Sequence, residues 1–373
     1  MYAFLVFVFL TIAILILGHL AKSRSKVWFG LIILLIPMYW GVTYLETVDM
    51  PGYVDLYSVL VKGITPSGVL RGLSYSSFEP AFLYLMQMFK DFGAPFFVFQ
   101  TCLLLFEVIL VGIGLYRVLR DYRQTTVFLV AISLYLSFWL MAAMRQGIPI
   151  AVFIFVLQDI IDKKYVKSIS FIALSSLFHS SGIFLLLLIL CYIIYRRMTT
   201  NKVFNYNLVI VYTVTLLFCD LVYIFDFSLS DILDRFTMML FSDNPFIYRD
   251  YTIMSNSENS NYGIMKFIEM NVIYLLTFYT HPQKEKEQYH YMLEVLFLVF
   301  FVFNTVAGGI IIHRLSYFLT IPYYLLFYKE IHRVAIRLRV PGFDTILFVM
   351  YLFFLFFRQY HPFTSYVFEY FTA

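Results

Sequence analysis

Long apolar runs separated by short polar breaks repeat along almost the whole chain. Runs of about 17–23 residues are long enough for an α-helix to cross the hydrocarbon core of a bilayer. The pattern predicts an all-α, polytopic integral membrane protein with about 12 transmembrane helices, forming a single transmembrane domain over residues 1–373. The predicted spans are 2–20, 27–45, 94–116, 125–143, 147–161, 168–178, 180–195, 207–226, 263–280, 290–312, 314–328 and 343–360. Several are short, and the pairs that meet at Arg145, His179 and Arg314 could instead be broken or re-entrant helices.

The polar breaks alternate between strongly basic ones and ones that are poorer in basic residues. The basic set comprises Lys22, Arg24, Lys26, Arg117, Arg120, Arg123, Lys163, Lys164, Lys167, Arg196, Arg197, Lys202, Lys284, Lys286, Lys329, Arg333, Arg337 and Arg339. Lys and Arg accumulate in the cytoplasmic loops of membrane proteins. The basic breaks are therefore predicted to face the cytoplasm, and the two long loops, residues 46–79 and 227–262, to face outward.

Composition supports the same class of protein. The chain is 61% hydrophobic and 13% charged, whereas a soluble domain is about 25% charged. The net charge of +4 follows from the predicted topology, so no nucleic-acid partner is expected. The sequence has no GxxxxGK[ST], HExxH, CxxC or GxSxG motif, which argues against ATP-driven transport within this chain and against the enzyme classes that these motifs mark.

Three basic residues, Arg145, His179 and Arg314, lie at tight turns on the predicted outer side. One arginine at a membrane interface is most simply explained by snorkelling toward headgroup phosphates. Three such residues on a face that is otherwise poor in basic residues favour a site for an anionic ligand. Guanidinium groups suit this purpose because they bind phosphate oxygens in a bidentate way.

The two long loops carry side chains that suit a sugar ligand. The first contains Asp49, Tyr53 and Glu79, and the second contains Arg249 and Asp250. Carboxylates can bind sugar hydroxyls or act as a base, and arginines can hold diphosphate oxygens. The alternative is a solvated loop that tethers an interfacial amphipathic helix, which the stretch ILDRFTMMLF fits.

The order of several short motifs resembles the EpsG family of exopolysaccharide and O-antigen loci, which is similar to the Wzy polymerases. In MRQGIPIAVFIFVLQDIIDKKYVKSISFIALSSLFHSSGIFLLLLI, an RQG is followed by an apolar helix, a Lys-rich turn and an LFH. Asp49 with Tyr53, FEPAFLYL at 78–85 and HRLSYF at 313–318 resemble further family elements, so the resemblance covers most of residues 45–330. The RX10G pattern of some O-antigen polymerases is absent, since Ser260 and Leu325 stand where its glycine would follow Arg249 and Arg314.

The resemblance implies a metal-independent glycosyltransferase that joins undecaprenyl-diphosphate-linked oligosaccharide repeat units into O-antigen or a related surface polysaccharide. It would act at the periplasmic face of the bacterial inner membrane, without a cofactor. A chain-length regulator and other polysaccharide assembly proteins are candidate partners. The implied catalytic residues are Arg145, His179 and Arg314, as a cationic clamp for the diphosphate leaving group. The implied substrate-binding residues are Asp49, Tyr53, Glu79, Gln146, Arg249, Asp250 and Tyr317.

Three other functions stay open on the sequence alone. A flippase for lipid-linked oligosaccharides would line a cavity through the bilayer with charges, whereas the polar groups here gather on one face. A membrane acyltransferase usually has a paired Arg and His around its first spans, and His19 before Lys22 does not form such an arrangement. A non-catalytic partner in a polysaccharide export complex is the third.

The alternation of breaks gives a testable topology. In a variant whose native cysteines are replaced, an impermeant thiol reagent should label Ser257→Cys and Ala373→Cys in intact spheroplasts. Lys163→Cys and Arg337→Cys should become labelled only after the membrane is opened, because their breaks are predicted to be cytoplasmic. Labelling of Lys163→Cys but not of Ser257→Cys in intact cells would reverse the assignment.

Overall fold

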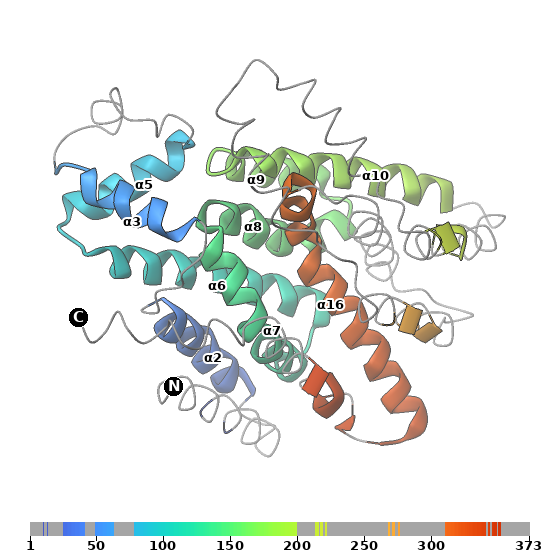
Figure 1. Cartoon of the computed structure of the whole chain (residues 1–373). Coiled ribbons are helices and arrows are strands. Elements are labelled where there is room, and N and C mark those ends of the chain that lie inside the picture. Colours follow the sequence, from blue (N-terminus) through green and yellow to red (C-terminus); the bar gives the residue numbers. More distant parts are fainter. Residues whose placement is uncertain are drawn as a thin grey trace. The chain divides into compact units, whose positions relative to one another are not determined.

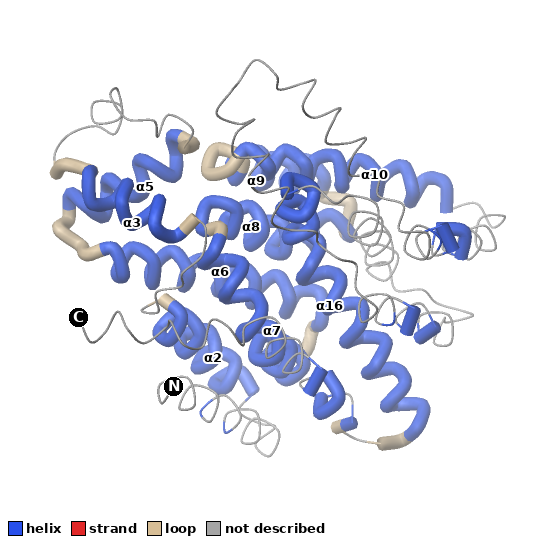
Figure 2. Tube along the Cα trace, viewed as in Figure 1, coloured by secondary structure: helices blue, strands red, loops and turns tan. Residues whose placement is uncertain are grey.

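A computed structural model of the chain describes residues 25–41, 49–62, 78–199 and 310–340, with short stretches elsewhere (Figure 1). In these parts all regular secondary structure is helical, as predicted (Figure 2). The chain divides into two compact units, Met1–Leu186 with Thr345–Ala373, and Leu187–Asp344. Each unit is described by itself.

The first unit contains most of the described helices. They are α2 (Ser25–Trp40), α3 (Met50–Val59), α5 (Pro80–Asp91), α6 (Phe96–Leu119), α7 (Tyr122–Ala142), α8 (Met144–Ile161), α9 (Tyr165–Ser175) and the short 3-10 helix η2 (Ser180–Gly182). Helix α10 (Ile183–Thr199) begins in this unit and continues into the second, which also holds α16 (Ile310–Leu338).

Several predicted spans correspond to observed helices. Helices α2, α6, α7, α8, α9 and α10 coincide with the predicted spans between residues 27 and 195 to within a few residues at most ends. Among the described helices, α6 and α8 are both long and apolar enough to cross a membrane. The spans 2–20, 207–226, 263–280 and 290–312, most of 343–360 and the loop 227–262 lie wholly or largely outside the described residues, so the total of 12 stays a prediction.

The region expected as the first outer loop contains helix α3, and α5 follows directly after it. Each begins beside a proline, Pro51 in the first turn of α3 and Pro80 at the start of α5, where the missing proline N–H costs no helical hydrogen bond. Helix α5 buries Phe82 and Met86 and exposes Tyr84. Its apolar residues therefore pack inward, and no helix was predicted over residues 80–91.

Glycine allows α6 and α8 to pack with their backbones in contact. A Cβ atom on Gly114 of α6 would clash with the carbonyl group of Ile154 and lie 2.8 Å from the Cα of Phe155. Small residues at helix interfaces are typical of packing within membranes. About two helical turns away from this contact, the Glu107 side chain of α6 lies against Gly147 of α8. Contacting residue numbers rise together on both helices, so α6 and α8 run parallel, and α7 connects the end of one to the start of the other.

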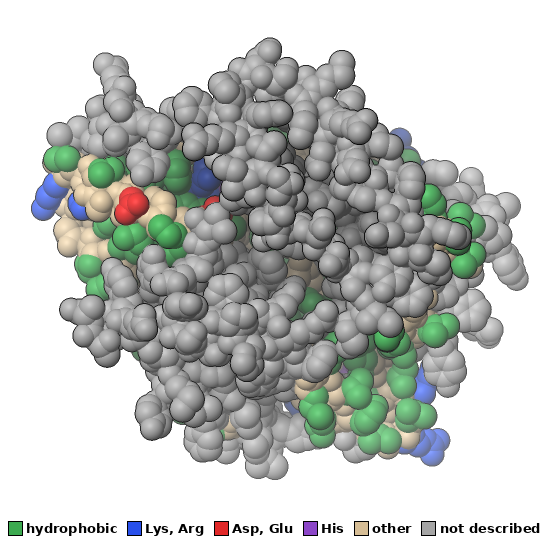
Figure 3. All heavy atoms as spheres, in the orientation of Figure 1, with side chains coloured by type: hydrophobic (Ala, Val, Ile, Leu, Met, Phe, Trp, Pro, Cys, Tyr) green, Lys and Arg blue, Asp and Glu red, His purple; other side chains and the backbone are tan. Residues whose placement is uncertain are grey.

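Large apolar side chains remain exposed on helices whose other faces are buried. Leu34 and Met38 of α2 are 51% and 65% exposed, and Phe97 and Phe106 of α6 are about equally open. Hydrophobic side chains also make up much of the described surface in the space-filling view, with few charged ones between them (Figure 3). Apolar surface on this scale marks contact with lipid or with another protein, in agreement with the membrane-protein composition.

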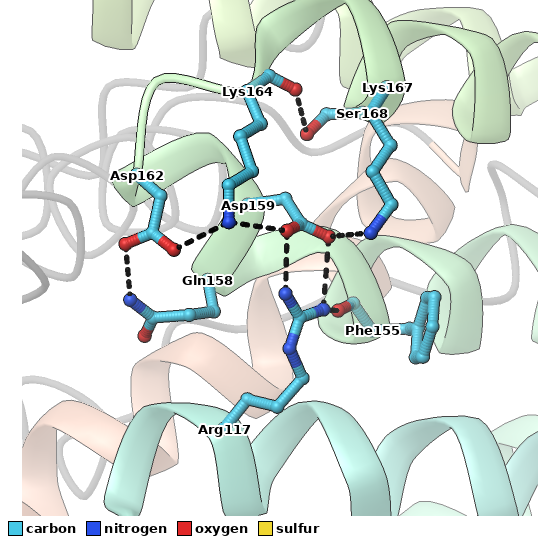
Figure 4. Close-up of polar contacts among 8 residues, drawn as sticks. All are labelled: Arg117, Phe155, Gln158, Asp159, Asp162, Lys164, Lys167 and Ser168. Carbon is cyan, nitrogen blue, oxygen red and sulfur yellow. Dashed lines mark hydrogen bonds and ion pairs between the residues drawn. The ribbon is translucent and has the colours of Figure 1, made fainter.

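At the end of α8, one buried carboxylate is surrounded by three cations (Figure 4). Asp159 accepts two hydrogen bonds from the Arg117 guanidinium, at 2.6 and 3.0 Å, and its side chain is fully buried. The Nζ atoms of Lys167 and Lys164 lie 3.1 and 3.9 Å from the same carboxylate. Arg117 also donates to the carbonyl oxygen of Phe155 at 2.8 Å. This cluster, the inner ion cluster, joins α6, α8 and the start of α9.

Helix α16 differs from the prediction at one point. A break was expected at Arg314, between spans 290–312 and 314–328. The helix instead begins at Ile310 and continues through Arg314 to Leu338, with Pro322 inside it. Because the helical backbone continues on both sides of Arg314, this arginine does not stand at a tight turn.

The inner ion cluster predicts a stability difference between two neighbouring aspartates. Asp159→Asn should destabilise the protein by about 3–5 kcal/mol, because it leaves the partly buried Arg117 without its counter-charge. Asp162→Asn is the matched control, since Asp162 is 37% exposed where it pairs with Lys164, and it should cost ~1 kcal/mol or less. Thermal unfolding of the detergent-solubilised variants measures both. Equal losses in the two variants would contradict the assigned role of Asp159.

Candidate functional site

Arg145 stands at the start of α8, directly after an interruption of the helical chain. Helix α7 ends at Ala142 and α8 begins at Met144, with Ala143 between them at φ −126° and ψ 57°. The expected break at Arg145 is thus present, but α8 starts earlier than expected. Pro149, which would be the third residue of the predicted span 147–161, is the sixth residue of the observed helix. Having no N–H, it cannot donate to the carbonyl of Arg145.

Arg145 forms an ion pair with Glu79, the residue that precedes α5. The Nη1 atom lies 2.8 Å from Oε2 of Glu79, and the two side chains are only 17% and 15% exposed. The guanidinium carbon also lies 4.1 Å from the centre of the Phe78 ring, a cation–π arrangement. The charge of Arg145 is therefore balanced by Glu79 and supported by an aromatic face.

The second carboxylate oxygen of Glu79 binds a third segment of the chain. Oε1 accepts a hydrogen bond from the backbone N–H of Ser180 at 3.0 Å, and the Ser180 hydroxyl lies 3.4 Å away. Burial raises the pKa of Glu79, but Arg145 and the Ser180 N–H outweigh it and hold this pKa below its ordinary value. Glu79 is therefore an anion that ties α5 to α8 and η2.

Hydrogen bonding assigns the protonation of His179, the residue that precedes η2. Its Nδ1 atom accepts from the backbone N–H of Ser181 at 3.1 Å, and the Ser181 hydroxyl lies 2.7 Å away. A backbone N–H can only donate, so Nδ1 carries a lone pair and the ring proton is on Nε2. The ring is therefore neutral, and its 3.9 Å approach to Glu79 is not an ion pair of full charges.

Tyr53 of α3 packs against the aromatic side of this group. Its ring is 2% exposed and meets the rings of Phe78 and Phe82 at centroid distances of 6.0 and 5.7 Å. Burial raises the pKa of the Tyr53 phenol, and Arg145 acts in the opposite direction. The backbone carbonyl oxygen of Asp49, one turn earlier, accepts a hydrogen bond from the backbone N–H of Tyr53 at 3.2 Å. Phe78, Glu79, Arg145, His179 and Tyr53 are called the outer cluster below.

A further carboxyl group lies close to the outer cluster, inside the helix pair. Glu107 of α6 is 1% exposed, and its carboxyl atoms occupy the space that a side chain on Gly147 would need. Among the described residues, its Oε1 has no hydrogen-bond partner. The missing side chain of Gly147 therefore lets the Glu107 carboxyl group approach the backbone of α8 closely.

The structure thus brings together four of the predicted site residues: Tyr53, Glu79, Arg145 and His179. Gln146 is 1% exposed and so does not face an open space. Arg314 and Tyr317 belong to α16 in the second unit, and Arg249 and Asp250 lie outside the described residues.

Sequence reasoning missed three contributors to the site: the serines after His179, the ring of Phe78 beneath Arg145, and the position of Glu107. The sequence signals for the first two were the stretches FE at 78–79 and HSS at 179–181, in which these residues adjoin predicted site residues. In the described part of the chain, no group of three His, Cys, Asp or Glu side chains could hold a metal ion.

Comparison with curated proteins and with solved structures gives no match for the chain. Comparison with family models gives one: the model of the EpsG family matches residues 26–372, nearly the whole chain. The match spans α2 to α16 and includes every residue of the outer cluster. The chain therefore belongs to the EpsG family, a Wzy-like polymerase family of membrane proteins in polysaccharide biosynthesis.

Proposed function

We propose that the protein joins undecaprenyl-diphosphate-linked oligosaccharide repeat units into O-antigen or a related surface polysaccharide at the outer face of the bacterial cytoplasmic membrane. The outer cluster is the proposed reaction centre. Family membership supports a glycosyltransferase-like polymerase. The identity of the lipid carrier, the membrane face and the use of arginine in place of a metal are part of the proposal.

The observation that carries this proposal is the placement of Arg145. It begins an apolar helix long enough to cross a membrane, and it is held by Glu79 while 17% of its side chain stays exposed. A diphosphate at the membrane surface carries more charge than one carboxylate and offers two oxygens to the guanidinium fork. It can therefore compete with Glu79 for Arg145.

In the proposed reaction, a hydroxyl oxygen of the incoming repeat unit attacks the anomeric carbon of the growing glycan. The bond from that carbon to the diphosphate oxygen breaks, and its electron pair leaves with the lipid diphosphate. Negative charge grows on the leaving group, which Arg145 stabilises most in the transition state. The N-terminal end of α8 contributes a partial positive charge in the same place. Arg314 of α16 is kept in the proposal as a second cation.

The distribution of polar groups along α8 supports a polymerase over a flippase. Between Gly147 and Leu157, α8 contains only apolar residues, and the described charges lie at its two ends. A flippase must offer polar groups along the whole path of the headgroup, because an unsolvated diphosphate in hydrocarbon is strongly unfavourable. A one-sided site requires no such path.

The fate of single repeat units tests the proposed function. A strain that lacks the protein should display surface glycan with one repeat unit, because synthesis and export of the unit continue while extension stops. Gel profiles of the surface glycan measure this. Complete loss of surface glycan would instead indicate a flippase, and unchanged long chains would exclude any role in extension.

Substitution of Arg145 tests the site. Arg145→Ala should slow chain extension by about 10²–10³-fold, the usual effect of removing one preorganised charge-stabilising donor. Arg145→Lys should recover part of the rate, because a point charge replaces the bidentate fork. The assay is extension of lipid-linked repeat units in complemented membranes, with protein abundance measured in parallel. Normal chains in both variants would make Arg145 a snorkelling anchor.

Two controls separate chemistry from folding damage. Arg120→Ala removes an exposed arginine at the C-terminal end of α6, away from the outer cluster. This variant should leave extension unchanged. Arg145→Ala leaves Glu79 without its counter-charge, so the double variant Arg145→Ala/Glu79→Gln should regain normal abundance without regaining activity. Recovery of activity in the double variant would show that the single variant failed through misfolding.

A further inference from the structure

We propose that Glu79 is the general base of the reaction and that binding of the lipid diphosphate to Arg145 releases it for this role. The inference rests on the proposed function, which it deepens by assigning the group that accepts the proton of the acceptor hydroxyl. In the absence of substrate, Glu79 is bound to Arg145 and is unavailable. With the diphosphate on Arg145, it becomes available beside the reacting carbon.

The two carboxylate oxygens of Glu79 have separate partners. One oxygen can therefore be released from Arg145 while the other holds the side chain in place. Oε2 is bound to Arg145 at 2.8 Å, whereas Oε1 is bound to the Ser180 N–H at 3.0 Å. A diphosphate that takes the guanidinium removes only the partner of Oε2. The Ser180 backbone, 101 residues away in sequence, continues to hold Oε1, so the freed oxygen still faces Arg145 and whatever is bound there.

The neighbouring candidates for the base are less suitable. His179 already uses its Nδ1 lone pair to accept from Ser181, and Nε2 carries the proton. In this arrangement it can donate a hydrogen bond to an anion but has no lone pair left for a proton. Glu107 is 1% exposed, so an acceptor sugar cannot reach it. Glu79 combines a carboxylate, partial exposure and contact with the proposed diphosphate ligand.

The charges around Glu79 explain how binding would change its basicity. The groups that act on Glu79 are Arg145 on α8, the Ser180 backbone N–H, and His179 before η2. Tyr53 of α3 faces Arg145, and Asp49, which precedes α3, acts on Tyr53. Burial raises the pKa of Glu79, and Arg145 is the largest influence that lowers it. A bound diphosphate neutralises Arg145, so burial then dominates and the carboxylate becomes a stronger base. The same event supplies the leaving group and activates the base.

The proton balance of the step is complete. The acceptor O–H bond breaks as the new glycosidic C–O bond forms, and the hydroxyl proton passes to Oε2 of Glu79. The electron pair of the broken carbon–oxygen bond leaves on the lipid diphosphate. When that product departs, Glu79 passes its proton to water and binds Arg145 again, which restores the starting state.

The rate and the ligand affinity of Glu79 variants test the proposal. The substrate is the lipid-linked repeat unit extracted from the deletion strain, and the protein is the full chain in lipid nanodiscs. Glu79→Gln should lower kcat by about 10²–10⁴-fold, the usual contribution of a general base. It should still bind undecaprenyl diphosphate at least as tightly as wild type, because a competitor for Arg145 has lost its charge. Asp55→Asn, an exposed acid on the neighbouring α3, is the matched control and should behave as wild type.

The pH profiles give a readout that a structural role would not change. In wild type, kcat and kcat/KM should both fall as pH decreases, since the base must be deprotonated. The fall in kcat should occur at higher pH, because kcat reports the complex and kcat/KM the free enzyme. Glu79→Asp should retain part of the rate and this acid limb, and Glu79→Gln should lose the limb. Identical limbs for kcat and kcat/KM would exclude release by the substrate.

Chemical rescue supplies an independent outcome. Formate, a small external carboxylate, should restore part of the rate of Glu79→Ala but none of the rate of Arg145→Ala. Normal kcat in Glu79→Gln, or loss of undecaprenyl diphosphate binding together with the rate, would overturn the assignment of Glu79 while leaving the polymerase function standing. A wild-type protein that extends no chains would overturn the proposed function, and this inference with it.

Discussion

Both ends of α8 carry a charge that is largely shielded from solvent, and a residue from another helix or its N-terminal boundary neutralises each one. Arg145 is paired with Glu79 at the start of α5, and Asp159 is paired with Arg117 of α6. A buried ion without a partner costs several kcal/mol, so these pairs fix the positions of α5 and α6 against α8. Between the two pairs, α8 is apolar and packs closely on α6 at Gly114.

The two ion pairs differ in the exposure of their carboxylates and in the number of cations around them. At the inner end, one fully buried carboxylate has three cationic neighbours, so loss of any single cation leaves it still compensated. At the outer end, Arg145 and Glu79 are both partly exposed, and Arg145 also lies over the ring of Phe78. In the proposed reaction the lipid diphosphate replaces Glu79 on Arg145, whereas the fully buried Asp159 is not open to such an exchange.

Much of the helical arrangement could be predicted from the sequence, because bilayer thickness fixes the length of an apolar run. This holds for α2 and for α6 to α10. The prediction of helices did not extend to α3 or α5, because both are too short to cross a bilayer. It also failed at Arg314, where a polar pair in an apolar run indicates a break but the described backbone stays helical.

The site was predictable only in part for a related reason. Arg145 and His179 stand out as basic residues in apolar surroundings, and Glu79 and Tyr53 stand out as polar residues in family motifs. The contacts that give them roles depend on packing between distant segments, such as Glu79 with Ser180. The neutral form of His179 likewise depends on the backbone geometry of Ser181. Neither can be read from the order of residues.

The length of α8 has a consequence for the membrane around it. Helical rise places Arg145 about 21 Å from Asp159 along the axis, whereas the hydrocarbon core of a typical bilayer is about 30 Å thick. If the inner ion cluster lay at headgroup depth, Arg145 would lie below the opposite headgroup plane of a bilayer of this thickness, unless the bilayer thinned beside it. Such hydrophobic mismatch costs fractions of a kcal/mol per Å. A thinned patch would bring a lipid-borne diphosphate down to the guanidinium while its polyprenyl tail stays in the hydrocarbon.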